Sequence, residues 1–203
     1  MMALTVGLPN QLDRGAPAML VWTVKSWQIV KPAQMRRRSM FSLEIETLAR
    51  LLIDEARERR LRIVTAESCT GGLVSAAITA VSGSSAVFDR GLITYSNHAK
   101  QDLLGVAGDM IADYGAVSEP VARMMAEGAL ENSNAHVSVA ITGVAGPTGG
   151  TELKPVGLVH FATCRANQSV HHRVERFGDI GREEIQMAAC QMALEMLRDR
   201  ITG

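Results

Sequence analysis

From residue 42 onward, hydrophobic and polar positions follow regular periods that predict a succession of helices and strands. Apolar residues at helical spacing predict an amphipathic helix that is capped by Ser42 and ends near Arg60. The apolar run 61–66 predicts a short buried strand, and the small residues up to about Ala80 predict a second helix. The same criteria predict strands over 87–96, 136–142, 156–166 and 170–177. They also predict three more helices: 97–104, capped by Asn97; one that starts after its cap Ser118; and 182–200.

The order of these segments predicts the fold class. Strands alternate with helices as far as residue 142, and two strands then follow each other across the turn Asn167–Gln168, as in a hairpin. Segment 136–142 consists almost entirely of small apolar residues, which is typical of a strand covered on both faces. We therefore expect an α/β fold, a three-layer α/β/α sandwich with a mostly parallel sheet and one antiparallel strand.

Residues 1–40 lack this regularity and differ in charge, because six basic residues accompany a single acid, Asp13. Two interpretations stay open. The stretch is a targeting segment, or it results from an upstream start codon, with natural translation beginning at Met35 or Met40; we favour the second. We expect a poorly ordered extension over 1–40 and one domain over 41–203.

The amino-acid composition excludes several classes of function. A hydrophobic content of 47% with 21% charged residues is typical of a soluble globular protein. Aromatic residues make up only 4%, and acids outnumber bases beyond residue 40, so we expect no direct binding of nucleic acid. No apolar stretch approaches the roughly 20 residues that span a bilayer. Widely spaced cysteines and scattered histidines favour a cytoplasmic protein without a metal site or cofactor.

The segment 65–72 (Thr-Ala-Glu-Ser-Cys-Thr-Gly-Gly) lies between a predicted strand and a predicted helix. Ser68 would therefore stand at the carboxyl end of a strand and beside a helix N-terminus, where unpaired amides and the helix dipole are available. Thr70, Gly71 and Gly72 leave room for a ligand near the backbone. An acyl-transfer enzyme needs such a place, so we expect Ser68 to be a nucleophile whose oxyanion donors come from the following helix.

Two other loops should meet Ser68 at the carboxyl ends of the parallel strands, namely 95–100 and 142–151. They contribute Tyr95, Lys100 and Thr142, whereas His98 and His160 do not assemble a convincing serine–histidine–acid triad. The economical hypothesis is a serine activated by a neutral, partly desolvated lysine.

Simpler interpretations stay open for each of these residues. Lys100 is also explained as a solvated helix lysine, and Tyr95 as a core aromatic. Cys69 is either a rival nucleophile or an inert cysteine, and Arg182 is either an anion ligand or a solvated first-turn arginine. The glycine-rich loop 143–151 matches neither GxGxxG nor a Walker A motif, which disfavours ATP or a dinucleotide.

Together these segments resemble the CinA C-terminal domain family, over residues 43–201. The resemblance is carried by 65–72, 95–100, 104–106, 115–118, 140–147 and 154–157. It implies an α/β/α sandwich with a five-stranded mixed sheet. It further implies metal-free hydrolysis of nicotinamide mononucleotide to nicotinic acid mononucleotide and ammonia. His98 stands where glutamate is usual in the family and Gln186 where arginine is common, and the second change would weaken phosphate binding.

On this resemblance Ser68 is the nucleophile, Lys100 the general base and Tyr95 its helper, with Thr142 at the reacting centre. We expect the substrate to be bound by Glu67, Thr70, Gly71, Gly72, Asn97, Gly143, Gly146 and Arg182. The expected partners are a small nucleotide substrate and further copies of the chain in a homo-oligomer. Two alternatives stay open: a non-catalytic nucleotide-binding module linked to competence or DNA damage, and an amidase for another small carboxamide.

Overall fold

The computed structural model describes residues 19–22, 27–30 and 39–203. The chain divides into two units, residues 1–40 and 41–203, and each is described by itself. In the first unit β1 (Met19–Trp22) pairs antiparallel with β2 (Trp27–Val30), which the hydrophobic pattern does not predict. Apart from β1, β2 and the last two residues of this unit, our expectation that residues 1–40 are poorly ordered concerns residues outside the described ranges.

The second unit contains the predicted helices and strands. Its helices are α1 (Leu43–Glu58), α2 (Leu73–Thr79), α3 (Asn97–Leu104), α4 (Gly108–Tyr114), α5 (Glu119–Glu131) and α6 (Arg182–Thr202), with the 3-10 turn η2 (Ser84–Ala86). Its strands are β3 (Ile63–Glu67), β4 (Phe88–Ile93), β5 (Val137–Gly143), β6 (Leu158–Arg165) and β7 (His171–Arg176).

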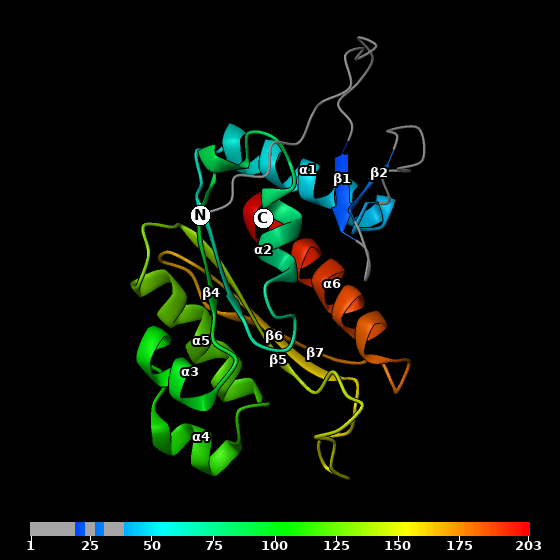
Figure 1. Ribbon diagram of the computed structural model, residues 1–203. Coiled ribbons are helices and arrows are strands. Elements are labelled where there is room, and N and C mark those ends of the chain that lie inside the picture. Colours follow the sequence, from blue (N-terminus) through cyan, green and yellow to red (C-terminus); the bar gives the residue numbers. More distant parts are fainter. Residues whose placement is uncertain (1–18, 23–26, 31–38) are drawn as a thin grey trace, which may run out of the picture. The chain divides into compact units, whose positions relative to one another are not determined.

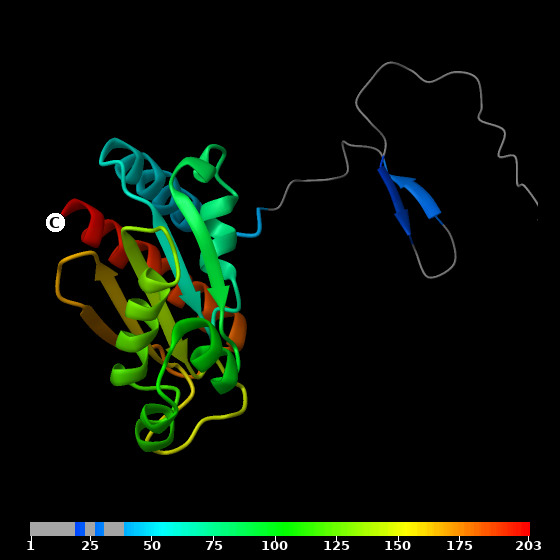
Figure 2. The same ribbon diagram turned by 90° about the vertical axis from the view of Figure 1, so that its left-hand side faces the viewer.

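These five strands form one mixed sheet in the order β4-β3-β5-β6-β7. Strand β3 is parallel to its neighbours β4 and β5, whereas β6 pairs antiparallel with both the central strand β5 and the edge strand β7. Of the five, β6 therefore runs against the others, as predicted. Figure 1 shows α1, α2 and α6 on one face of the sheet and α3, α4 and α5 on the other, and Figure 2 shows the sheet between these layers. The expected α/β/α sandwich is confirmed.

The apolar sequence of β5 results from burial on both faces. Val139 and Ile141 belong to the core that α1 and α6 cover, while Ala140 belongs to the core beneath α5. Successive side chains of a strand point to opposite faces, so both sets must be apolar. The close approach of α5 to the end of α3 explains a glycine inside a helix, because a Cβ at Gly128 would collide with the carbonyl of Leu104.

One helix was missed, and the side-chain caps of two others differ from the prediction. Helix α4 was not predicted, because glycines at 105 and 108 resemble a loop and the helix has only seven residues. Helix α3 is capped by Ser96, whose Oγ accepts from the Ala99 amide at 3.0 Å, and not by Asn97. Ser118 stands at the start of α5, but its hydroxyl donates to the Gly115 carbonyl instead of capping the helix.

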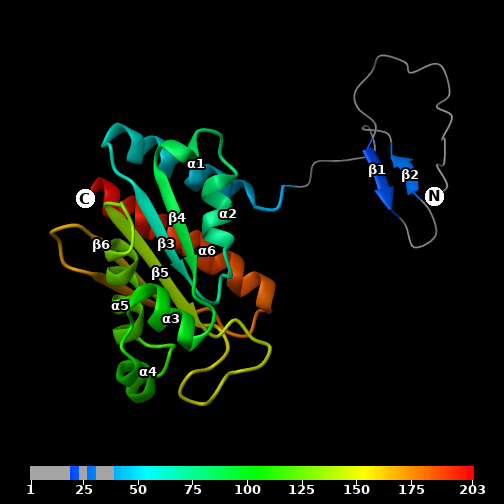
Figure 3. The same cartoon turned by 60° about the vertical axis from the view of Figure 1, so that its left-hand side comes forward.

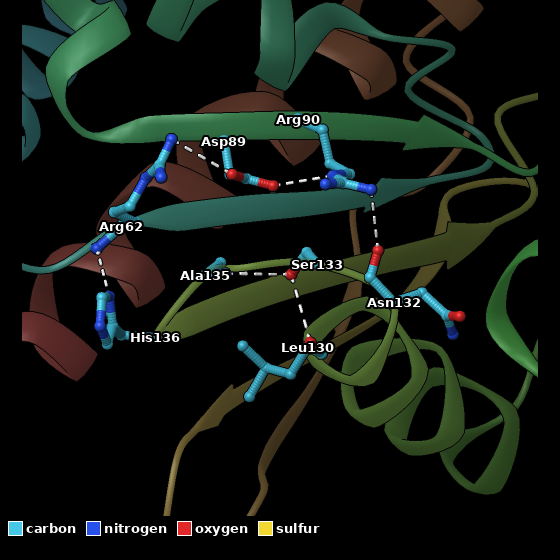
Figure 4. A network of polar contacts seen from close by, with 8 residues as sticks. All are labelled: Arg62, Asp89, Arg90, Leu130, Asn132, Ser133, Ala135 and His136. Atoms are coloured by element: carbon cyan, nitrogen blue, oxygen red, sulfur yellow. Dashed lines mark hydrogen bonds and ion pairs between the residues drawn. The ribbon is translucent and has the colours of Figure 1, made fainter.

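A polar network ties the strands together at the amino ends of β3 and β5, beside β4 (Figure 4). Asp89 accepts from Arg90 Nε at 2.7 Å and lies 3.2 Å from Arg62 Nη2, and its side chain is only 6% exposed. Arg90 also donates to the Asn132 carbonyl, and the Arg62 amide donates to His136 Nδ1 at 2.9 Å. Burial would raise the pKa of Asp89, but hydrogen bonds from Arg90 and from a backbone amide, with both arginine charges, hold it below its ordinary value.

The Asp89→Asn variant is expected to be less stable than the wild type at neutral pH, by roughly 1–3 kcal/mol. Because the folded pKa of Asp89 is depressed, its ionised form contributes stability above the unfolded pKa, and this contribution is lost as the pH falls through the folded value. The difference in melting temperature should therefore shrink between pH 7 and pH 3. Asp113→Asn, on the exposed side of α4, is the matched control. A difference that is independent of pH would contradict an electrostatic role.

Candidate active site

The carboxyl ends of β3, β4 and β5 lie at one end of the sheet, from which the loop after β5 projects (Figure 3). A cavity of about 370 Å³ opens there. It is lined by Ser68, Cys69, Tyr95, Asn97, Lys100, Ala116, Val117, Thr142, Gly143, Val144, Ala145, Gly146, Thr148, Gly149 and Arg182. The position agrees with the rule that ligands collect beyond the carboxyl ends of parallel strands.

Ser68 and Lys100 form a close pair in this cavity. Lys100 Nζ lies 2.9 Å from Ser68 Oγ and donates to the Thr94 carbonyl at 2.7 Å. Ser68 follows β3, and its amide donates to the Ile141 carbonyl of β5, which holds the turn against the sheet. Lys100 lies on α3, which starts three residues after Thr94 and so returns the lysine over the end of β4. Thirty-two residues of sequence separate the two side chains.

The environment of Lys100 is that of a base and not of a solvated lysine. The residue is 1% exposed, and burial lowers its pKa to about 8, partly opposed by Cys69. A neutral amine can keep its bond to Thr94 and accept the Ser68 proton. Burial instead raises the pKa of Cys69 to about 12, so its thiol stays protonated at neutral pH. The thiol is therefore the weaker candidate for the nucleophile.

Glu67 caps helix α2 and does not face the cavity. Its carboxylate is fully buried and accepts from the amides of Gly72, Val74 and Ser75 at 2.8–3.1 Å. It also accepts from the hydroxyls of Thr70 and Ser75. The carboxylate thus occupies the unpaired amides of the first turn and offsets the positive end of the helix dipole.

This cap overturns the expectation that the N-terminus of α2 supplies the oxyanion donors. Within the described residues, backbone amides without an acceptor border the cavity at other places. One belongs to Cys69, on the turn after β3 that carries Ser68 (the Ser68 turn), and the others belong to Ala145, Gly146, Thr148 and Gly149 of the glycine-rich loop. These groups are the ones available to a developing negative charge.

The Glu67→Gln variant should lose both stability and the order of the Ser68 turn. A glutamine replaces one acceptor oxygen by an NH₂ group that faces other donors, and an unsatisfied buried donor costs about 1–3 kcal/mol. We expect a lower melting temperature than in Glu183→Gln, which changes an exposed carboxylate in the first turn of α6. Equal melting temperatures for these two variants would refute the capping role.

The opposite wall of the cavity is held by Arg182, the first residue of α6. Its guanidinium donates to the Gly146 carbonyl at 2.8 Å and to the Tyr95 hydroxyl at 2.8 Å, and so joins the glycine-rich loop to the end of β4. Tyr95 is 60% exposed and is therefore not a core aromatic. Thr142 is buried and donates to the Ala116 carbonyl at 2.8 Å, which fixes the loop before α5 beside Ser68.

Gln186 makes a contact that the resemblance to the family does not predict. Its Nε2 donates to the Cys69 carbonyl at 2.8 Å, across 117 residues of sequence. The side chain therefore braces the turn that carries Ser68, and it does not line the cavity. Nothing in the local pattern around residue 186 signals this contact, because it depends on how α6 packs against α2.

The structure brings most of the predicted residues together and leaves some outside. Eight of them line the cavity: Ser68, Tyr95, Asn97, Lys100, Thr142, Gly143, Gly146 and Arg182. Glu67, Thr70, Gly71 and Gly72 do not, and their proposed contact with substrate stays a prediction that the geometry does not favour. Among the described residues no histidine lines the cavity: His98 is exposed on α3, and His160 pairs with His172 at 3.0 Å. Ala116 and Val117 line it without having been predicted as ligands.

Among the described residues we find neither a candidate metal site nor a candidate membrane-spanning helix. No three histidine, cysteine, aspartate or glutamate side chains in this part of the chain converge as a metal site would require. No described helix combines the length and the apolar character needed to cross a bilayer.

Comparison with known proteins identifies relatives of the second unit. The family model of the CinA C-terminal domain matches residues 45–201. A CinA-like protein of Syntrophus aciditrophicus is 44% identical over 166 residues, which cover 81% of this chain and 39% of that protein. The chain thus spans only about two fifths of the length of this curated relative.

Two solved structures match almost along their whole length. The competence/damage inducible protein CihA from Agrobacterium tumefaciens is 51% identical, with a TM-score of 0.79 over 81% of this chain and 99% of that chain. A protein of the competence-damaged protein (CinA) superfamily from Escherichia coli is 36% identical, with a TM-score of 0.74 over 81% of this chain and 97% of that chain.

Proposed function

This chain belongs to the CinA C-terminal domain family, and on that premise we propose that it is an amidohydrolase acting on nicotinamide mononucleotide. The products would be nicotinic acid mononucleotide and ammonia. The observation that carries the proposal is the buried Lys100 amine 2.9 Å from the Ser68 hydroxyl, at the edge of an open cavity. A serine hydroxyl is a poor nucleophile by itself and needs a base at hydrogen-bond distance.

In the proposed reaction, neutral Lys100 takes the Ser68 proton as Oγ bonds to the carboxamide carbon. The tetrahedral intermediate collapses as its C–N bond breaks and Lys100 returns the proton to the leaving nitrogen, which departs as ammonia. A water molecule then attacks the acyl-enzyme, again with Lys100 as base, and releases the carboxylate product and the free serine. Lys100 thus alternates between its two protonation states, as a pKa of about 8 allows at neutral pH.

The remaining cavity groups support binding of a small anionic amide. The unpaired amides of Cys69 and of the glycine-rich loop are our assigned oxyanion donors. Arg182 offers a guanidinium at the cavity wall, suited to a phosphate, and Asn97 offers an amide. A volume of about 370 Å³ lies within the usual range for small-molecule sites.

The direct test is ammonia release from nicotinamide mononucleotide by the full chain, without added metal. Nicotinic acid mononucleotide should form in equal amount. Nicotinamide riboside, which lacks the phosphate, should react more slowly if Arg182 binds that group, and the preference should diminish in Arg182→Gln. Binding of nicotinamide mononucleotide without ammonia release would overturn the amidase and favour a nucleotide-binding module. Faster release from an unphosphorylated carboxamide would assign the enzyme to another substrate.

A further inference from the structure

A second and larger cavity lies away from Ser68, between β7, the end of α6 and the start of α5. Its volume is about 690 Å³. Figures 2 and 3 show the end of α6, marked C, beside the turn that joins β6 to β7. Its charged and titratable lining residues are Arg123, Arg173, Arg200, His171, His172 and Asp199, and Gly203 also lines it. The lining thus contains three arginines and one aspartate, and two of the arginines are paired with glutamates outside the lining.

Arg200 is a buried guanidinium without an acidic partner. The residue is 7% exposed, and among the described residues no carboxylate lies within ion-pairing distance of it. Its Nη groups contact the Ser169 carbonyl and the His171 ring, while its Nε is buried without any partner. Burial, together with the charge of Arg165 nearby, lowers the pKa of Arg200. Buried charges in proteins are normally paired, so we expect an anion to bind beside this arginine.

The other two arginines of the cavity keep hydrogen-bond donors free for an anion. Arg123 is paired with Glu119 and donates to the Val170 carbonyl, and Arg173 is paired with Glu175. Each guanidinium has five N–H donors, so both keep donors free for a ligand. Glu119 also lies 3.4 Å from His172. Among the described residues Asp199 forms no side-chain hydrogen bond or ion pair with Arg200, and its charge raises the pKa of Arg198 instead.

We propose that this cavity is a second binding site, for a small phosphorylated compound whose phosphate group Arg200, Arg173 and His171 hold. Arginine forks match phosphate oxygens in pairs, which favours phosphate over a halide. No phenylalanine, tyrosine or tryptophan side chain lines the cavity in the described part of the chain, so a nucleobase would find none of these three rings to stack on. Thr163 and Gln168 add a hydroxyl and an amide that suit a polyol attached to the phosphate.

The test is calorimetric titration of the full chain with inorganic phosphate and with ribose 5-phosphate, at constant ionic strength, with ribose as the uncharged control. Saturable binding of both anions is expected, weakened about tenfold or more in Arg173→Gln, because that variant loses a charge-assisted hydrogen bond to the phosphate. Arg176→Gln changes the same charge on the same strand outside the cavity and should bind as the wild type does. Ribose should not bind.

Two further variants keep the result interpretable. Arg200→Lys retains the charge but not the fork and should also bind weakly, and its melting temperature reports whether it folds. Arg182→Gln removes the cation of the proposed active site, so phosphate binding that persists there belongs to the second cavity. No saturable binding, or binding lost in Arg182→Gln but retained in Arg173→Gln, would overturn the proposal. Either result leaves the amidase assay unaffected.

Discussion

Replacing Ser68 with alanine is expected to lower amide hydrolysis by about 10⁶-fold, the loss measured when another serine hydrolase is deprived of its nucleophile. The variant removes the Oγ that lies 2.9 Å from Lys100 and leaves the backbone of the turn in place, because the Ser68 amide still donates to Ile141. Steady-state ammonia release, with the melting temperature recorded in parallel, measures the effect. An unchanged melting temperature would show that the loss is chemical.

Two matched variants accompany this experiment. Ser133→Ala makes the same substitution in the network at the other end of the sheet and should retain wild-type turnover. Cys69→Ala tests the neighbouring thiol, which burial keeps protonated, and its activity should stay well above that of Ser68→Ala. Turnover that survives in Ser68→Ala and disappears in Cys69→Ala would transfer the nucleophile to the thiol.

Replacing Lys100 is expected to have the second largest effect. Lys100→Met keeps the length and removes the amine, and Lys100→Arg keeps a positive charge that cannot be given up near neutral pH. Both should lower the rate by at least about 10²–10⁴-fold, the usual contribution of a general base. Lys154→Met, which alters a lysine that donates to the Tyr114 carbonyl outside the cavity lining, is the control. Wild-type turnover in Lys100→Arg would contradict the role of a base.

The pH dependence of ammonia release by the wild-type protein tests the proposed role of Lys100 independently. With a pKa of about 8, roughly a tenth of Lys100 is neutral at pH 7 and half at pH 8, so kcat/KM should rise over this range and level off above it. The rise follows from the sign of the shift, because burial disfavours the charged amine. A profile that falls with pH between 7 and 9 would exclude a neutral lysine base.

The sequence by itself determined most of the arrangement of elements and the position of the proposed nucleophile. Helical periodicity after Ser42 and the apolar runs of β3 and β5 are local signals, because each element must bury its own face. The order of the elements then placed three loops at one end of a parallel sheet. Ser68 and Lys100 could therefore be paired without coordinates, although burial of Lys100 could not be read from its neighbours.

Tertiary structure decided which groups are free to act. The amides of α2 looked available in sequence, yet the Glu67 carboxylate turns back from the end of β3 and occupies them. Gln186 reaches Cys69 across 117 residues, and Arg200 meets His171 only when α6 packs against the sheet. Hydrophobic periodicity specifies which face of an element is buried, but the partner of a polar side chain depends on distance and direction in space. That distance and direction are fixed only when the helices have packed against the sheet.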